Sequence, residues 1–144
     1  MLQIQRIRQE PEAVIKGLEK RHLDARETVA SLIELDEERR NIRTKLEANQ
    51  HRSNELAKEI GQLFKSGRGA EAEAMKAETG ELKQAIKELN ELVQSLTEKE
   101  HDLLLTLPNV PHESVAAGKS EQENEEIKRV GDIPQLHEGA KPHW

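Results

Sequence analysis

Apolar residues recur at alternating intervals of three and four along two long stretches of the chain. The seam positions of the first stretch are Leu32, Leu35, Arg39, Ile42, Leu46, Asn49, Ser53, Leu56, Ile60 and Leu63. Those of the second stretch are Met75, Thr79, Leu82, Ile86, Leu89, Val93, Leu96, Glu100, Leu103 and Leu107. This alternation is a heptad repeat, which is typical of helices that pack side by side as a coiled coil.

A short turn separates the two stretches, because the repeat stops at Ser66-Gly67-Arg68-Gly69 and ends at Pro108. A connection this short forces the two helices to fold back on each other, so we predict an antiparallel hairpin. A turn centred between Gly67 and Arg68 places residues whose numbers sum to 135 in the same layer. Each helix would then be about 55 to 60 Å long.

The segments on either side of the hairpin are shorter. In residues 1–26, Pro11 fits the first position of a short helix with Val14, Ile15 and Leu18 on one side, and Asp24 with Glu27 resembles the cap of the next helix. Residues 27–107 form the predicted arm. Residues 108–144 are rich in Pro and Gly with one short strand at 126–130, and we expect them to be an extended tether that leads into a further domain.

Composition supports an elongated all-α fold. Of the 144 residues, 34% are apolar and 35% are charged, with one Phe, one Trp and no Tyr, which argues against a thick globular core. There is no Cys, signal peptide or apolar run of membrane-spanning length. We therefore expect a cytoplasmic protein that is not embedded in a membrane.

The charge of the chain changes sign along the predicted arm. The net charge of -6 argues against nucleic acid, yet residues 39–87 carry 11 Lys and Arg against 7 Asp and Glu. The flanking residues 27–38 and 88–106 are acidic. Cations off the seam could contact an RNA backbone: Arg40, Arg43, Lys45, Arg52, Lys58, Lys65, Arg68, Lys76, Lys83 and Lys87. Equally, these residues could pair with Glu along or across the coiled coil.

Other chemistry is poorly supported by the sequence. Readers of single strands stack bases on aromatic rings, and the arm offers only Phe64, so duplex shape is the more fitting target. Gly67-Arg68-Gly69 is better explained as a turn than as a phosphate loop, and the six His residues lack metal-ligand spacing. We predict no catalytic and no metal site, and we interpret Arg39 and Glu100 as an ion pair within the seam.

Several motifs resemble seryl-tRNA synthetases. They are Glu34-Leu35-Asp36-Glu37-Glu38-Arg39-Arg40, Asn54-Glu55-Leu56-Ala57-Lys58-Glu59-Ile60-Gly61, Leu107-Pro108-Asn109-Val110-Pro111-His112-Glu113-Ser114-Val115 and the terminal Lys141-Pro142-His143-Trp144. Asn54, within the second motif, joins the candidate contacts to tRNA. The sequence departs from the family's common pattern at Val115-Ala116, where the family has Val-Pro, and at Val130, where it has an aromatic residue.

The resemblance implies the N-terminal arm of a class II serine–tRNA ligase whose catalytic domain lies beyond Trp144. Such an enzyme is a homodimer that uses ATP and Mg²⁺ to attach serine to tRNA. The arm would hold the long variable arm and the elbow of serine tRNA, so that the acceptor end enters the other subunit, with no role for DNA or a membrane. The alternatives are a structural or chaperone-like coiled coil without RNA binding and, less favoured, a minimal catalytic domain.

Overall fold

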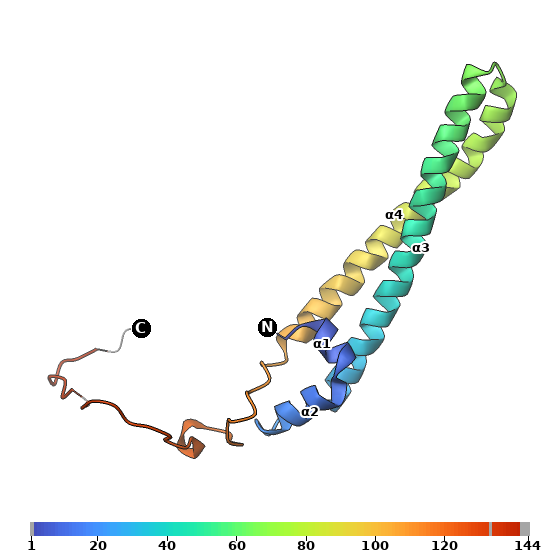
Figure 1. Ribbon diagram of the computed structural model, residues 1–144. Coiled ribbons are helices and arrows are strands. Elements are labelled where there is room, and N and C mark those ends of the chain that lie inside the picture. Colours follow the sequence, from blue (N-terminus) through green and yellow to red (C-terminus); the bar gives the residue numbers. More distant parts are fainter. Residues whose placement is uncertain (1, 133, 142–144) are drawn as a thin grey trace.

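The computed structural model describes residues 2–132 and 134–141 and consists of four helices, one 3-10 turn and an extended C-terminal segment (Figure 1). Helix α1 spans Ile4–Gln9, α2 spans Pro11–Glu19, α3 spans Arg26–Lys65, α4 spans Gly69–Leu105 and η1 spans Glu121–Glu123. Part of the motif Lys141-Pro142-His143-Trp144 lies outside the described residues. The predicted all-α fold is confirmed.

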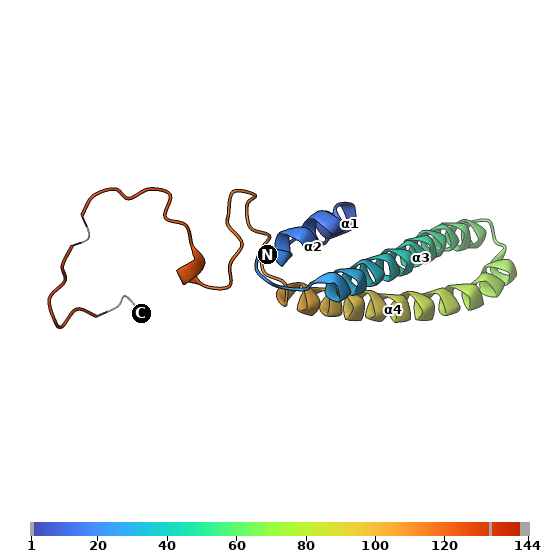
Figure 2. The same cartoon turned by 90° about the horizontal axis from the view of Figure 1, so that it is seen from below.

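Helices α3 and α4 run antiparallel along most of their length and form a rod that projects from the rest of the molecule (Figures 1 and 2). Every predicted seam position is buried or half-buried, which confirms the heptad pattern. Helix α3 has 40 residues and is therefore about 60 Å long. The pairing of layers whose numbers sum to 135 stays a prediction.

The turn between the long helices is a Schellman motif at the end of α3. Gly67 has φ +77°, which a residue without Cβ adopts at little cost. The Gly67 amide donates to the Phe64 carbonyl at 3.2 Å, and the Arg68 amide donates to the Leu63 carbonyl at 2.9 Å. These bonds satisfy carbonyls that the helix end would otherwise leave unpaired and allow α4 to begin at Gly69.

The main apolar core lies where α1 and α2 pack against the base of the hairpin. Ile7, Val14, Leu18, Val29 and Leu32 are each at most 1% exposed. From α4, Leu104 and the following Leu107 join this core with Leu103 beside it, whereas Leu105 is 61% exposed. Leu103 and Leu104 therefore pack at the base of the hairpin, whereas Leu105 points to another side of the helix.

The start of α3 differs from the predicted capping box. The N-cap residue is Ala25, whose side chain cannot accept a hydrogen bond. Asp24 stands one residue earlier, and its Oδ1 accepts from the Arg26 amide at 3.2 Å. Asp24 thus still satisfies one amide of the first turn, but without the reciprocal bond from Glu27 that a capping box requires. Pro11 is at the first position of α2, as predicted.

The segment after Pro108 begins by following the surface of α2. Side chains of Lys20 and Arg21 donate to carbonyls of residues 109–118, which we call the anchored segment: Lys20 Nζ to Glu113 at 2.6 Å and to Val115 at 3.2 Å, and Arg21 Nη1 to Asn109 at 3.2 Å. The Gly118 amide donates to the Lys20 carbonyl at 2.9 Å. The beginning of the predicted tether is therefore held by the N-terminal helices.

The strand predicted at residues 126–130 is absent, and the structure describes all five of these residues. Ile127 and Val130 are 85% and 80% exposed. A strand requires a neighbouring strand to pair its backbone amides and carbonyls, and no described part of the chain lies beside this segment as a strand. Ile127 and Val130 are β-branched and favour a strand locally, but no strand in the described part of the chain pairs with this segment.

None of the described helices is long and apolar enough to cross a membrane.

Candidate nucleic-acid interface

The predicted cations divide into those held by a carboxylate and those that are not. Arg40 pairs with Asp36 at 3.0 Å, Arg43 with Glu47 at 3.1 Å and Lys76 with Glu73 at 2.6 Å. Arg52 pairs with Glu78 at 2.9 Å, and Arg68 pairs with Glu71. Within residues 2–132 and 134–141, Lys45, Lys58, Lys65, Lys83 and Lys87 form no such pair. The ion-pair interpretation is therefore confirmed for five of these cations, whereas contact with RNA stays a prediction.

Asp36 is the buried centre of an ion network at the base of the hairpin. Its side chain is 1% exposed and accepts hydrogen bonds from Arg8 at 2.9 Å, Arg39 at 2.9 Å and Arg40 at 3.0 Å. Burial by itself would raise the pKa of Asp36, but the hydrogen bonds and charges of Arg8 and Arg40 together hold this pKa below its ordinary value. Arg8 comes from α1, so the network ties the N-terminal helices to α3.

The predicted ion pair within the seam is confirmed. Arg39 Nε donates to Glu100 Oε2 at 2.8 Å, and both side chains are largely buried. Arg39 also bonds to Asp36, so the seam pair is continuous with the network at the base. Because Arg39 is occupied on both sides, it acts in holding α3 to α4 and is not free to bind a phosphate.

The residues beside the seam form two faces of opposite charge. Two contacts between the helices identify these faces. Lys76 Nζ lies 5.5 Å from the centroid of the Phe64 ring on one side, and Arg52 bonds to Glu78 on the other. Helical periodicity then assigns the remaining residues to one side or the other.

The basic face is the side that contains Lys76 and Phe64. Within residues 38–102 it carries five cations and two carboxylates, a net charge of +3: Arg40, Arg43, Lys76, Lys83 and Lys87 with Glu47 and Glu73. The same side at the base is covered by α1 and α2, because Val29 and Asp36 occupy equivalent positions of α3 and are buried there. Figure 2 shows these two short helices on one side of the hairpin.

The acidic face is the side that contains Arg52 and Glu78. Within residues 38–102 it carries three cations and eight carboxylates, a net charge of -5: Lys45, Arg52 and Lys99 with Glu38, Glu55, Glu59, Glu71, Glu78, Glu81, Glu88 and Asp102. The overall charge of the arm therefore conceals a difference of eight charges between its two faces. Lys58 and Lys65 lie on neither face but on the outer side of α3, and Asn54 is exposed on the basic side.

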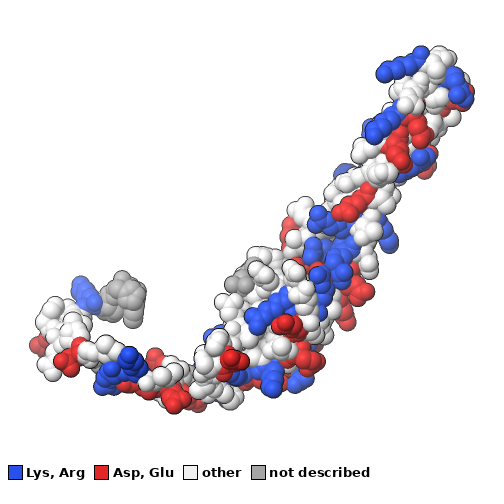
Figure 3. Space-filling model, viewed as in Figure 1, with Lys and Arg blue, Asp and Glu red and all other residues white. Residues whose placement is uncertain are grey.

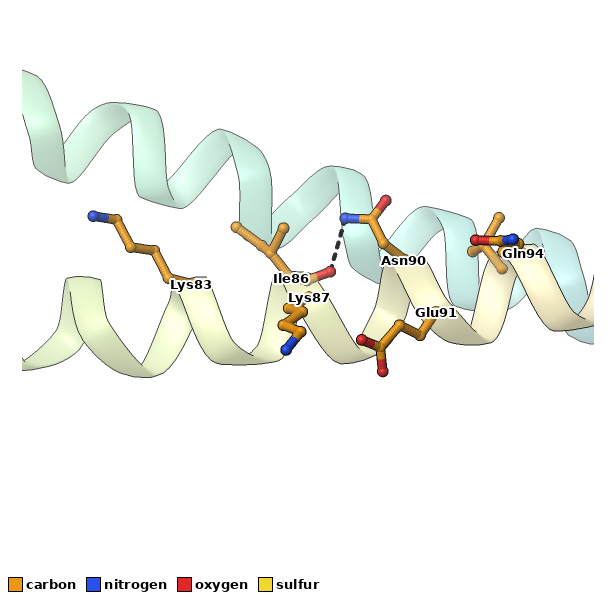
Figure 4. A pocket seen from close by; sticks show the side chains of 7 residues that line it. Lys83, Ile86, Lys87, Asn90, Glu91 and Gln94 are labelled. Carbon is orange, nitrogen blue, oxygen red and sulfur yellow. Dashed lines mark hydrogen bonds between the residues drawn. The ribbon is translucent and has the colours of Figure 1, made fainter.

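Lys and Arg side chains gather about halfway along the rod, with further ones at its tip (Figure 3). A surface groove of about 640 Å³ runs along this part of α4 and is lined by Lys83, Ile86, Lys87, Asn90, Glu91, Val93 and Gln94. Lys83 and Asn90 extend on the side toward α3, whereas Lys87 and Glu91 point away from it (Figure 4). Asn90 Nδ2 donates to the Ile86 carbonyl at 2.8 Å. The groove thus presents ammonium groups and amides, which suit phosphate and ribose oxygens, together with the carboxylate of Glu91.

Two features of the site were not predicted from the sequence. The separation of charge by face could have been found by assigning each cation a heptad position, since the pattern was already known. Asp36 could have been suspected from Arg39 and Arg40, which follow it by three and four residues. The contribution of Arg8 had no such signal, because it depends on how α1 packs on α3.

The described residues hold no group of three His, Asp or Glu side chains that could bind a metal ion.

The comparisons with known proteins agree on one family. Residues 1–111 match the seryl-tRNA synthetase N-terminal domain family. The serine–tRNA ligase of Salinibacter ruber is 38% identical over 144 residues, which are 100% of this chain and 34% of that protein. The serine–tRNA ligase of Carboxydothermus hydrogenoformans is 39% identical over 144 residues, which are 100% of this chain and 33% of that protein. The chain thus spans about a third of the length of the curated relatives it matches.

Solved structures share the fold. Seryl-tRNA synthetase from Pyrococcus horikoshii, complexed with ATP, aligns with a TM-score of 0.73 at 35% identity over 85% of this chain and 27% of that chain. The cytoplasmic serine–tRNA ligase of Naegleria fowleri, in complex with AMP, aligns with a TM-score of 0.70 at 23% identity over 96% of this chain and 37% of that chain. Most of this chain's fold is therefore shared with these structures.

Proposed function

The chain belongs to the seryl-tRNA synthetase N-terminal domain family, and from this premise we propose that it is the tRNA-binding arm of a serine–tRNA ligase. The arm binds the long variable arm and the elbow of serine tRNA. In doing so it positions the acceptor end for aminoacylation by a catalytic domain, which belongs to the partner subunit of a homodimer in the cytoplasm.

One observation carries this proposal, namely that Lys and Arg side chains gather on the outer part of a rod about 60 Å long. A rod of this length can lie along an RNA stem and contact several phosphates at once, which gives affinity that depends on shape and charge. Phe64 is the one aromatic residue of the hairpin and is half-exposed at the tip beside Lys76. Such a surface favours the backbone of a duplex over stacked single-stranded bases.

We assign ATP and Mg²⁺ to the catalytic domain of such a ligase, and for the nucleotide a related structure is complexed with ATP. Gly67-Arg68-Gly69 forms the hairpin turn and not a phosphate loop. The described residues also place no cluster of carboxylates or imidazoles where a metal could bind. The chemistry that attaches serine is therefore assigned to that catalytic domain.

The test measures binding of the 144-residue chain to serine tRNA by fluorescence anisotropy at two salt concentrations. Two controls are the same tRNA with a shortened variable arm and a different tRNA whose variable arm is naturally short. Tighter binding of the long-armed form, weakening as salt rises, would support the proposal. Equal affinity for all three RNAs would reject shape recognition, and no binding at the lower salt concentration would favour a structural coiled coil instead.

A further inference from the structure

We propose that the arm binds RNA through one side only, with the basic face against the phosphates and the acidic face turned to solvent. This inference rests on the proposed function, because it states which surface of the arm binds the RNA. It also assigns a positioning role to the carboxylates of the acidic face, which repel a phosphate backbone placed on the wrong side. The arm would then have a single rotational orientation about its own axis when bound.

Two of the three lysines of the basic face are available to a ligand, whereas Lys76 pairs with Glu73. Lys83 and Lys87 are exposed, lie one turn apart on α4 and have no carboxylate within ion-pair distance in the described part of the chain. Lys76 extends the basic face toward the tip of the arm. From Arg40 to Phe64, which lies beside Lys76, the face extends about 36 Å, comparable with one turn of a nucleic-acid duplex.

The basic face has a glycine in its middle, and this second observation favours close approach by a partner. Gly80 lies between Lys76, Lys83 and Lys87 on one side of α4. A Cβ added at Gly80 would meet nothing within 4 Å, so packing inside the protein does not require the missing side chain. Gly is unfavourable in a helix interior relative to Ala, and a flat surface that admits another backbone is an explanation of its presence.

The acidic face offers no equivalent surface. Its central cation, Arg52, is held by Glu78 at 2.9 Å and lies 3.8 Å from Glu59. Lys45 and Lys99 are exposed and have no ion-pair partner among the described residues, but eight carboxylates share their face. These two lysines therefore provide a matched control for Lys83 and Lys87, with the same side chain, similar exposure and opposite surroundings.

The decisive experiment compares Lys83→Gln/Lys87→Gln with Lys45→Gln/Lys99→Gln in binding to serine tRNA. Gln keeps the helix propensity close to that of Lys, so both variants are expected to melt like the unchanged chain. We expect the first pair to weaken binding about tenfold and to reduce the slope of log K against log salt by about 2. The second pair should change binding less than about twofold, because few phosphates approach those lysines.

A further pair tests close approach without changing charge. Gly80→Gln places a neutral side chain on the basic face, and Ala77→Gln places the same side chain on the outer side of α4. We expect Gly80→Gln to weaken binding several-fold and Ala77→Gln to leave binding unchanged. The one-sided interface would be overturned if the Lys83/Lys87 variant weakened binding no more than the Lys45/Lys99 variant, and Gly80→Gln no more than Ala77→Gln. RNA binding itself would then still stand. Failure of the unchanged chain to bind any RNA would instead reject the proposed function, and this inference with it.

Discussion

The base of the hairpin and its outer part are stabilised in different ways. At the base, α1 and α2 cover the hairpin, and residues from four helices share one core. Between residues 40 and 95, only Leu46, Leu56 and Ala72 are buried, since two helices alone cannot enclose the rest of the seam. The difference indicates a platform that sets the direction of the arm and an outer rod whose surface is left free for a partner.

The two regions also use charge differently. The Asp36 network at the base is centred on a buried carboxylate and joins α1, α3 and, through Arg39, α4. The pairs farther out, such as Arg43 with Glu47, are exposed on both sides and contribute little to stability. Charge therefore serves packing at the base and remains available for recognition along the rod.

The largest expected effect comes from making the same cavity in both regions. Leu32 and Leu56 are both fully buried. We expect Leu32→Ala to lower the free energy of unfolding by about 4 kcal/mol and Leu56→Ala by about 2 kcal/mol. The base is enclosed on several sides and cannot collapse into the cavity, whereas the two helices farther out can approach each other. Urea unfolding followed by circular dichroism measures both values, and equal losses would contradict the comparison.

The next effect concerns the buried carboxylate. Asp36→Asn removes the charge that three arginines share, and we expect it to lower the free energy of unfolding by about 3 kcal/mol. Glu47→Gln removes an exposed partner of Arg43 and should cost less than about 0.5 kcal/mol. Similar losses from the two variants in urea unfolding would mean that burial does not distinguish the base from the rod.

The pH dependence of stability isolates the same carboxylate. The pKa of Asp36 in the folded chain lies below its ordinary value of 3.8, so the unfolded chain binds a proton more readily than the folded one. Its contribution is fully present above pH 3.8 and is lost as pH falls through the lowered pKa. Acid unfolding of Asp36→Asn should therefore be less steep below this pH than that of the unchanged chain.

A smaller effect tests how the anchored segment lies on the base. A Cβ at Gly17 would clash with Cγ1 of Val110, so Gly17→Ala should displace this segment and cost about 2 kcal/mol. Limited proteolysis should then cleave residues 109–118 faster. Adding Val110→Ala removes the obstructing methyl groups and should restore part of the loss. A double variant no more stable than the sum of the single changes would show that these two residues do not interact.

The smallest effect has the opposite sign and comes from the rod. Gly80→Ala should raise the free energy of unfolding by about 1 kcal/mol, because the added methyl group meets no neighbour and Ala favours the helix. Ala77→Gly, three residues earlier on the outer side, should lower it by a similar amount. Thermal melting monitored by circular dichroism measures both changes. A loss of stability from Gly80→Ala would indicate a packing requirement that the open surface does not suggest.

Much of the hairpin could be predicted because it depends on local spacing. The seam, the turn at Gly67 and the pair of Arg39 with Glu100 all follow from the heptad repeat and the position of its interruption. The strand at residues 126–130 was predicted wrongly, since β-branched residues favour a strand only when a partner strand exists. The domain boundaries and the residues that contact tRNA stay predictions.

The candidate site shows the same division. Composition along the chain located the basic region between residues 39 and 87, and the structure then separated its cations by partner and by face. Lys83 and Lys87 face solvent, whereas Arg40 and Arg52 are held by carboxylates that lie on the same helix or across the hairpin. A linear count of charge cannot make this distinction, because it ignores which groups come within bonding distance.

The sequence by itself determined the two long helices and the place where they turn, since each depends on residues within a few positions of one another, and the short turn then required antiparallel packing. The tertiary structure alone decided that Arg8 reaches Asp36, that Lys20 holds the anchored segment and that Gly17 admits Val110. The hydrogen bonds of Arg8 and Lys20 join groups that lie 28 to 95 residues apart in the sequence. Their geometry arises only when the helices have packed, because packing and not local preference brings such groups together.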